Sequence, residues 1–289
     1  MGGAHRFPPG IFGEQGALMQ ETDIARRGLV LLGCGKMGSA MLEGWLARGL
    51  PPSSVHVIDP SPSDWLQGTG VNLNGDTPAD PALVLVAVKP QMMSDALPQL
   101  QPAAGGPTLF VSVAAGVSLQ RYEVMLGAAT PIIRAMPNTP AAVGKGITAI
   151  AGNAQVTEKH LQTAEDLLSA VGEVVRLEDE TQMDAVTGIS GSGPAYVFHM
   201  IEAMAAAGEA EGLTPDLALA LARATVAGAG ALAQESGEDP GTLRENVTSP
   251  NGTTQAGLEV LMKDEGGLSQ LIRETVHAAA ERSRELGRG

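Results

Sequence analysis

Short apolar runs, separated by turn residues and helix-like stretches, dominate the first half of the chain. The runs occupy residues 28–33, 55–58, 83–88, 109–113, 132–136, 147–151 and 174–177. Near-continuous apolar runs of this length are typical of strands that are buried on both faces of a parallel sheet. Their alternation with helices predicts a doubly wound α/β sheet, with ligands at the carboxyl ends of its strands. Ser118 and Thr157 are placed to cap two of the helices, the second over 158–171.

The strand pattern stops near Asp179, and helical periodicity replaces it. Val197, Ile201 and Met204 share one helix face, and Thr214 with Pro215 predicts a capped helix start. The chain therefore divides into a sheet domain, 28–178, and a helical domain, 179–289.

The helical domain is rich in small residues. Residues 217–235 consist largely of Ala and closely spaced Gly. Such side chains let helices approach closely, but each buries little area. We expect helices from a second subunit to complete this core, and packing against the sheet domain is the alternative that the sequence leaves open.

The first 27 residues lack these patterns. They include Phe7-Pro8-Pro9-Gly10 and contain no apolar segment of a secretory signal. We expect residues 1–27 to be a disordered extension. No apolar run of the chain approaches the length of a membrane-spanning helix, so no membrane is expected.

Charge and cysteine content restrict the partners. Lys and Arg number 18 against 32 for Asp and Glu, which gives a formal net charge of −14. An acidic balance disfavours nucleic acid and anionic membranes, yet permits a local basic pocket for a phosphate. Cys34 is the only cysteine, so an intrachain disulfide is excluded and a reduced, cytoplasmic location is expected.

A glycine-rich motif, Gly33-Cys34-Gly35-Lys36-Met37-Gly38, lies between the first apolar run and a helix-like stretch. In this context Gly33 permits a tight turn, Gly35 lets the backbone approach a pyrophosphate, and Gly38 allows helix and strand to pack closely. The motif predicts a Rossmann-type dinucleotide site. Cys34 is expected to be a small buried filler rather than a nucleophile, since no base lies near it in sequence.

An acidic residue, Asp59, ends the second apolar run, and Pro60 follows it. A carboxylate here would bind the adenosine ribose hydroxyls and disfavour a 2′-phosphate, which favours NADH. However, the hydroxyls of Ser61 and Ser63 could still bind a phosphate, and Asp59 could turn away. NADH and NADPH therefore both remain open.

The loops after residues 88 and 113 end predicted strands and should face the cofactor. Lys89-Pro90 ends the third run, and Ala114-Ala115-Gly116 ends the fourth. Lys89 could be a catalytic lysine, but we favour a residue that frames the cofactor pocket.

Residues 246–257 interrupt helix-forming sequence with one proline and two glycines. Thr253 or Thr254 can cap the helix predicted over 255–262, and a helix start is an anion-binding site. A plain connection between two helices is the alternative interpretation.

Two other kinds of site are excluded. Segment 188–194 is not a nucleophile elbow, because neither Ser190 nor Ser192 completes G-x-S-x-G and no strand precedes it. It is predicted to be a flexible turn that opens the helix of Tyr196. The five histidines lack the spacing of a metal site, and a packed or solvated His199 is preferred over a catalytic acid.

Several motifs together resemble pyrroline-5-carboxylate reductase over roughly residues 28–286. They are Gly33–Gly38, Ala87-Val88-Lys89-Pro90, Ala114–Val117, Met136–Pro140, Ser190–Tyr196 and Val247–Thr254. The sequence departs from the family at Asn251, where glycine is common, and in the extension before residue 28.

This resemblance implies a Rossmann domain followed by an all-α dimerisation domain, similar to the C-terminal domain of 6-phosphogluconate dehydrogenase. It implies reduction of L-1-pyrroline-5-carboxylate to L-proline with NADPH or NADH, as the last step of proline biosynthesis. It also implies a homodimer that interlocks and assembles into a ring such as a decamer, a pentamer of dimers. The implied cofactor residues are Gly33 to Gly38, Asp59, Pro60, Ala87, Val88, Lys89, Pro90, Ala115, Gly116 and Asn138.

For the substrate, the resemblance implies the loop from Val247 to Thr254, with Asn251 as part of it. Ser249 and the N–H groups of Gly252 and Thr253 would hold the substrate carboxylate. Thr254, the implied catalytic residue, would lie near the ring nitrogen and orient it. Whether Thr254 also helps to protonate the imine stays open.

Two rival functions make other demands on the sequence. The first rival is a β-hydroxyacid dehydrogenase-like oxidoreductase. Enzymes of that class resemble one another in using a lysine at the start of the second domain, but here no lysine occurs between Lys159 and Lys263. A non-catalytic nucleotide-binding scaffold would not need the second loop, yet Ser249 and Thr254 are present. The reductase is preferred, and a six-membered imino acid stays open as substrate because a pocket discriminates one methylene only weakly.

Overall fold

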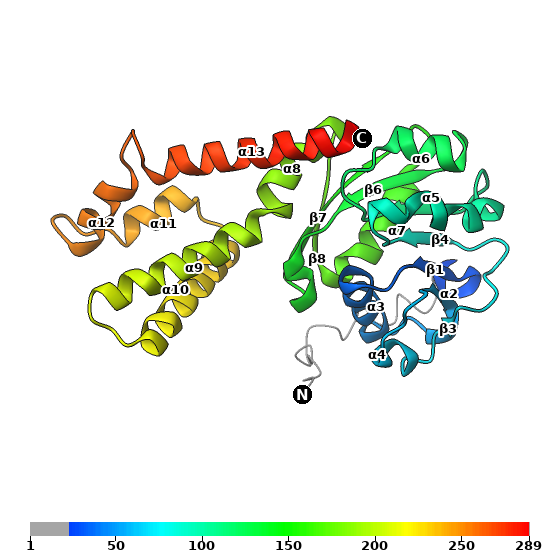
Figure 1. Cartoon of the computed structure of the whole chain (residues 1–289), viewed down its shortest axis with the longest axis horizontal. Coiled ribbons are helices and arrows are strands. Elements are labelled where there is room, and N and C mark those ends of the chain that lie inside the picture. The colour runs from blue at the N-terminus through cyan, green and yellow to red at the C-terminus, as the bar shows by residue number, and fades with distance from the viewer. Residues whose placement is uncertain (1–22, 289) are drawn as a thin grey trace. The chain divides into compact units, whose positions relative to one another are not determined.

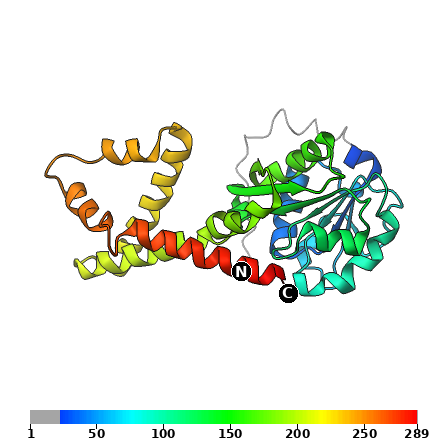
Figure 2. The ribbon, with the colours of Figure 1, turned by 90° about the horizontal axis from the view of Figure 1, so that it is seen from above.

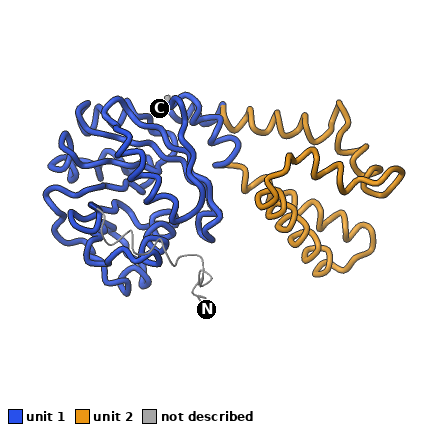
Figure 3. Tube along the Cα trace, turned by 180° about the vertical axis from the view of Figure 1, so that it is seen from behind, with its two compact units in different colours: residues 1–191, 281–289 blue, residues 192–280 orange. Residues whose placement is uncertain are grey.

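A computed structural model of the chain describes residues 23–288, which form two compact units (Figures 1 and 3). Residues 23–191 and 281–288 make up the first unit, and residues 192–280 make up the second. The sequence placed the division earlier, after residue 178. The end of the last helix belongs to the first unit, where Ser283 Oγ donates to Asp184 Oδ1 over 2.6 Å. Most of the expected extension, residues 1–22, lies outside the described residues.

The first unit is built on one eight-stranded sheet (Figure 1). Its strands are β1 (Leu29–Leu32), β2 (Val55–Ile58), β3 (Asn72–Leu73), β4 (Leu83–Val86), β5 (Leu109–Ser112), β6 (Ile132–Met136), β7 (Gly146–Gly152) and β8 (Gly172–Arg176). Their order in space is β3-β2-β1-β4-β5-β6-β7-β8. This order reverses direction between β1 and β4, and a reversal of this kind is where α/β sheets bind ligands.

All neighbouring pairs in the described sheet are parallel except β6 and β7, which are antiparallel. The doubly wound sheet that the sequence predicted therefore contains one antiparallel pair, which the sequence did not indicate. The connection over 137–145 is too short for the crossover that a parallel pair needs. Strand β3 is also additional, because its pattern is too short and too polar to predict it.

Helices cover both faces of the sheet (Figure 2). They are α2 (Asp23–Arg27), α3 (Lys36–Ala47), α4 (Asp64–Gln67), α5 (Met93–Ala96), α6 (Leu119–Leu126), α7 (Glu158–Leu168) and α8 (Met183–Val186). Alternate residues of β1 enter two separate cores, Leu29 and Leu31 with α3 and α7, Val30 and Leu32 with α5 and α6. This alternation explains why the strand runs are apolar at every position.

Two predicted helix caps are confirmed, whereas the end of α7 and the end of the expected N-terminal extension differ from the prediction. Ser118 Oγ accepts from Arg121 N and Thr157 Oγ1 accepts from His160 N, each at 3.3 Å. Helix α7 ends at Leu168, before a short 3₁₀ turn. The end of the supposed extension is ordered as α2: Ile24 is buried, and Arg27 Nη2 lies 2.8 Å from Asp80 Oδ1.

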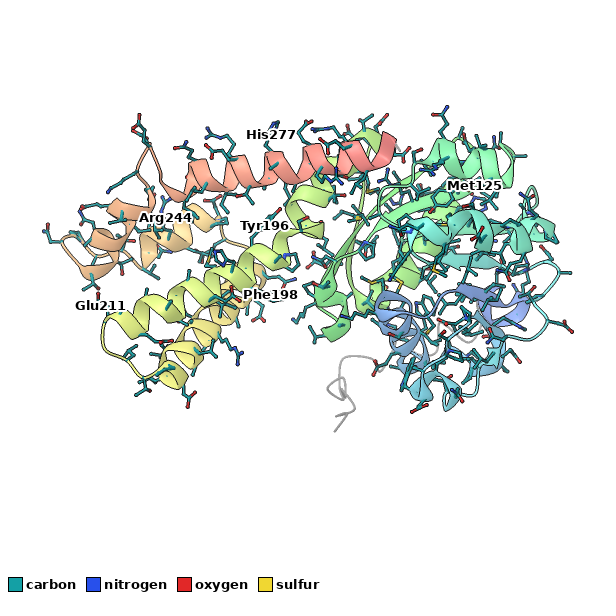
Figure 4. All side chains as sticks on the ribbon, viewed as in Figure 1. Met125, Tyr196, Phe198, Glu211, Arg244 and His277 are labelled. Atoms are coloured by element: carbon teal, nitrogen blue, oxygen red, sulfur yellow. The ribbon has the colours of Figure 1, made fainter. Side chains whose placement is uncertain are left out.

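The second unit is entirely helical in its described residues. Its helices are α9 (Gly193–Ala210), α10 (Pro215–Ser236), α11 (Pro240–Asn246), α12 (Thr253–Leu261) and the first part of α13 (Leu268–Arg288). Helices α9 and α10 pack through the small side chains of Ala205, Ala218 and Ala222. As predicted from the composition, this core is small. Large apolar side chains stay exposed around it, including Phe198 on α9, labelled in Figure 4, at 59%.

Helix α10 is long and apolar enough to span a membrane by length and composition, with a mean hydropathy of 1.4. The expectation that no segment reaches that length was wrong by this criterion. Only 11% of its apolar window is buried. At its start Thr214 is the N-cap residue and Pro215 follows, but the Thr214 side chain makes no capping hydrogen bond.

The segment predicted to be a flexible turn is helical. Residues Thr187–Gly191 form a π-helical stretch between α8 and α9. Ser190 Oγ donates to the Val186 carbonyl over 3.1 Å, which ties the segment to the preceding helix. Pro194 is tolerated because it lies in the first turn of α9.

Gly172 offers a test of the register between β7 and β8. It has φ +147°, and a Cβ there would lie 1.9 Å from the Gly146 carbonyl oxygen. We expect Gly172→Ala to lower the free energy of unfolding of the first unit by about 2–5 kcal/mol, through backbone strain and overpacking. Urea denaturation followed by tryptophan fluorescence measures this, because Trp45 and Trp65 both lie in the first unit.

Gly106→Ala is the matched control. A Cβ at Gly106 meets no atom within 4 Å, so this variant should unfold like the original protein. Equal stability of the two variants would contradict the strand pairing at Gly172.

Candidate active site

The glycine-rich loop joins β1 to α3 with little room for side chains. Gly33 has φ +86°, and a Cβ there would lie 2.8 Å from Val88 Cγ1. A Cβ on Gly38 would lie 2.5 Å from the Gly33 carbonyl oxygen. The tight turn and the close helix–strand approach that were predicted from the motif are therefore confirmed.

Gly35 differs from its two neighbours in the motif. A Cβ on Gly35 would meet no atom within 4 Å, so it would project into open space. Helix α3 begins here, and its first amide to donate within the helix is that of Ser39, to the Gly35 carbonyl at 2.8 Å. The amides of Lys36, Met37 and Gly38 precede it, and unpaired amides at a helix start attract anions. The loop fits a pyrophosphate.

Asp59 is attached to this loop. Its Oδ2 accepts from Cys34 N over 2.7 Å, and its Oδ1 accepts from Ser61 N over 2.8 Å. The residue lies at the end of β2, beside β1, where the sequence placed it. The hydrogen bond from Cys34 N to Asp59 therefore joins the glycine-rich loop directly to the residue predicted to bind the adenosine ribose.

The ends of β4 and β5 complete the edge of the sheet. Ala87 N donates to the Leu32 carbonyl over 2.8 Å, which places the Ala87–Pro90 segment next to the glycine-rich loop. Lys89 and Pro90 are exposed there. After β5, Ala115 is exposed, and Gly116 adopts φ +74° in the turn before α6. Lys89 therefore lies exposed at the edge of the sheet that carries the glycine-rich loop, and its role in framing the cofactor pocket stays a prediction.

Asn138 is used structurally. Its Oδ1 accepts from Ile147 N over 2.9 Å, and its Nδ2 donates to the Ser190 carbonyl over 3.2 Å. The residue is buried, and each polar atom of its side chain has a backbone partner. Binding of the cofactor by Asn138 stays a prediction. The two hydrogen bonds of its side chain do not favour that role.

The sequence reasoning missed an ion pair between buried Arg134 and half-buried Glu180, next to the start of α6. Arg134 Nη1 on β6 lies 2.7 Å from Glu180 Oε1, which also accepts from Leu119 N at the start of α6 over 2.9 Å. Ser118 and Asp184 join the ion pair in lining a polar cavity of about 600 Å³. An arginine inside an otherwise apolar strand run was the signal that could have revealed it, since buried charges need partners.

Cys34 is buried beside Asp59. Burial, with the negative charge of Asp59, raises the pKa of the Cys34 thiol to about 12. The thiol is therefore protonated at neutral pH, as expected for a filler residue rather than a nucleophile. The described residues contain no group of three or more His, Cys, Asp or Glu side chains that could hold a metal ion.

The second predicted site is the loop between α11 and α12 in the second unit. Asn251 adopts φ +59°, and its N–H donates to Gln255 Oε1 over 2.7 Å. Asparagine tolerates this left-handed conformation better than most residues. A Cβ on Gly252 would lie 2.3 Å from Ser249 Oγ, so a larger residue there would have to displace the Ser249 side chain.

The helix start differs from the prediction. Helix α12 begins at Thr253 with Gly252 as N-cap, and no side chain caps it, so neither Thr253 nor Thr254 has that role. The Gly252 N–H donates to the Ser249 carbonyl over 3.0 Å, whereas Ala256 N is the first amide to donate within the helix. Val247, Ser249, Thr253 and Thr254 are exposed. Exposed hydroxyls therefore lie in sequence beside the first amides of α12.

Gly35→Ala tests the open space in the glycine-rich loop. Because a methyl group there touches no protein atom but occupies the predicted pyrophosphate position, we expect dinucleotide affinity to fall at least about tenfold. The free energy of unfolding without ligand should not fall. Calorimetric titration with a reduced dinucleotide and urea denaturation measure the two quantities.

Gly75→Ala serves as the control, since a Cβ at this exposed glycine also meets no atom within 4 Å. It should change neither quantity. Unaltered dinucleotide affinity in Gly35→Ala would remove the pyrophosphate from this loop.

Comparisons with known proteins agree with this arrangement. Residues 180–286 match the family described as pyrroline-5-carboxylate reductase dimerisation, and residues 28–116 match NADP oxidoreductase coenzyme F420-dependent. The pyrroline-5-carboxylate reductase of Pseudomonas aeruginosa is 39% identical over 264 residues, which cover 89% of this chain and 96% of that protein.

Solved structures extend the similarity to three dimensions. A pyrroline-5-carboxylate reductase from Coxiella burnetii has a TM-score of 0.85 at 34% identity, covering 90% of this chain and 98% of that one. The pyrroline carboxylate reductase of Plasmodium falciparum, solved with NADP bound, has a TM-score of 0.78 at 29% identity, covering 91% and 99%. The dinucleotide loop, the helical second unit and these relatives together establish that the chain belongs to the pyrroline-5-carboxylate reductase family.

Proposed function

We propose that this chain reduces L-1-pyrroline-5-carboxylate to L-proline, using NADPH or NADH as the hydride donor. The proposal rests on one observation, that the same chain contains a candidate dinucleotide site and a candidate carboxylate site. One is a glycine-rich loop with open space at Gly35, and the other is a helix start at Thr253 whose first amides are available to a carboxylate. Relatives named for this reaction cover nearly the whole chain.

The substrate carboxylate is proposed to bind at the start of α12. The amide of Thr253 and the hydroxyl of Ser249 are donors on the same exposed loop. The Gly252 amide can contribute only if it leaves its present partner, the Ser249 carbonyl. A helix start favours an anion through its unpaired amides and its dipole, and a side chain at Gly252 would displace the Ser249 hydroxyl.

The reaction requires little acid–base chemistry from the protein. A cyclic imine is readily protonated, and the resulting iminium carbon is electrophilic. The bound dinucleotide supplies the hydride, and the protein supplies position. We assign Thr254 to orientation of the ring nitrogen, because a hydroxyl is a poor acid by itself.

The assembly is proposed to be a homodimer formed through the second unit. Its exposed apolar side chains include Phe198, Leu217, Leu221, Leu232, Val260 and Leu271. A single chain rarely exposes so much apolar surface, and residues 180–286 match a dimerisation family. We further propose that five such dimers assemble into a decamer. The location that we propose for the protein is the cytoplasm.

The defining experiment follows oxidation of NADH and of NADPH by the purified chain, with pyrroline-5-carboxylate as the acceptor. We expect proline to form in step with loss of the reduced nicotinamide absorbance. The six-membered cyclic homologue should also react, since one methylene is weakly discriminated. Absence of oxidation with both cofactors and both acceptors would defeat the proposal.

Thr254→Ala separates orientation from binding. We expect kcat to fall at least about tenfold, because a misplaced reacting atom loses much of the proximity effect. The Kd for the reduced dinucleotide should stay the same, since Thr254 lies on the loop of the second unit. Steady-state kinetics and calorimetric titration give these values.

Thr242→Ala is the control for this variant. Thr242 is an exposed threonine of α11, outside the loop, and its own amide bonds to Asp239. Its kinetics should equal those of the original protein, and the same behaviour from Thr254→Ala would exclude Thr254 from the site.

A further inference from the structure

The end of β2 contains the feature that decides between the two cofactors. We infer that this chain prefers NADH to NADPH, because the adenosine-ribose end of the site holds a fixed carboxylate and lacks a cation for a 2′-phosphate. The inference rests on the proposed dinucleotide site and deepens it. Relatives whose names include NADP leave this preference of the present chain undecided.

Asp59 is held in place from both sides. Cys34 N donates to its Oδ2 over 2.7 Å, and Ser61 N donates to its Oδ1 over 2.8 Å. Its backbone is held as well, since Asp59 N donates to Asn74 Oδ1 over 2.9 Å and Asn74 Nδ2 donates to the Asp59 carbonyl over 2.8 Å. The carboxylate therefore does not turn away from the glycine-rich loop.

A fixed carboxylate suits two ribose hydroxyls. Each carboxylate oxygen can accept about two hydrogen bonds, so one backbone bond apiece leaves room for a hydroxyl on each. A 2′-phosphate carries negative charge and has no proton to donate at neutral pH. At the same place it would repel Asp59 instead of bonding to it, and such repulsion is how sites reject the wrong ligand.

The three residues directly after Asp59 offer no free backbone donor for a phosphate. Pro60 and Pro62 have no N–H, and the Ser61 N–H already donates to Asp59. Ser63 Oγ is the cap of α4 and accepts from Leu66 N over 3.2 Å. The serine hydroxyls that had kept NADPH open are neutral donors, so they do not offset the charge of a dianion beside Asp59.

Positive charge is also missing from this part of the chain. No Lys or Arg occurs between Arg48 and Lys89, whereas Asp64, Asp76 and Asp80 lie in that interval. Arg48 is directed elsewhere, with Nη1 donating to Ser169 Oγ over 2.8 Å. Lys36 in the glycine-rich loop is the nearest alternative, and its exposed side chain makes no ion pair with Asp59 among the described residues.

Calorimetric titration of the full chain with NADH and with NADPH tests the inference without any turnover. We expect NADH to bind at least about tenfold more tightly, because the acidic residue binds ribose hydroxyls. Adenosine 5′-diphosphate and adenosine 2′,5′-bisphosphate, titrated in the same way, should show the same order. Tighter binding of NADPH than of NADH by the original protein would overturn the inference.

The variant Asp59→Asn tests whether the Asp59 charge causes the preference for NADH. The amide oxygen can still accept from Cys34 N, but the charge is lost, so the ratio of the two Kd values should move toward NADPH by about tenfold or more. Asp216→Asn, at the exposed start of α10, removes an equal charge elsewhere and should leave the ratio unchanged. A ratio in Asp59→Asn equal to that of the original protein would overturn the assignment to Asp59.

Two further measurements keep the outcome clear. Lys36→Gln should leave the ratio unchanged, and a selective loss of NADPH affinity in that variant would show a phosphate site that contradicts the inference. If Asp59→Asn fails to fold, as circular dichroism would show, the original protein's ratio alone decides. Tight NADH binding without reduction of pyrroline-5-carboxylate would refute the proposed reaction and leave this inference standing.

Discussion

The close approach of α3 to the end of β1 is the constraint on which the cofactor half depends. Gly38 and Gly33 lie so near each other that a Cβ on Gly38 would meet the Gly33 carbonyl oxygen at 2.5 Å. This contact places the first amides of α3 at the carboxyl edge of the sheet, beside the end of β4. The hydrogen bond from Cys34 N to Asp59 then joins β2 to the same loop. A pyrophosphate fits this loop because backbone, rather than side chains, forms its surface, whereas the inferred ribose site is the Asp59 carboxylate.

The second unit follows the opposite design. Small residues such as Ala205 and Ala222 let α9 and α10 pack closely, but they leave much larger apolar side chains exposed. A helical unit of this kind gains little free energy from its own core and depends on another surface for burial. Its family match to a dimerisation domain supplies the reason. Helix α10 meets the length and hydropathy of a membrane span, and only 11% of its apolar window is buried.

Local sequence patterns predicted most elements and failed where distant partners decide. Apolar runs located seven of the eight strands to within a few residues, and Ser118 and Thr157 cap their helices as expected. The failures have physical causes. Strand β3 is too short for a pattern, β7 is antiparallel because its connection is short, and segment 187–191 is helical although it is rich in glycine and serine. The Arg134–Glu180 pair was missed because its partners are far apart in sequence.

The sequence by itself determined the family and the fold class and predicted the residues of two candidate sites, because a motif such as Gly33–Gly38 carries its own geometric requirements. Only the tertiary structure decided what each polar atom contacts. Both oxygens of Asp59 accept backbone N–H groups, the Asn138 side chain bridges β7 and the π-helical stretch, and Gly252 rather than a threonine caps α12. The physical reason is that a hydrogen bond depends on atoms brought together by folding, and one-dimensional spacing does not specify them.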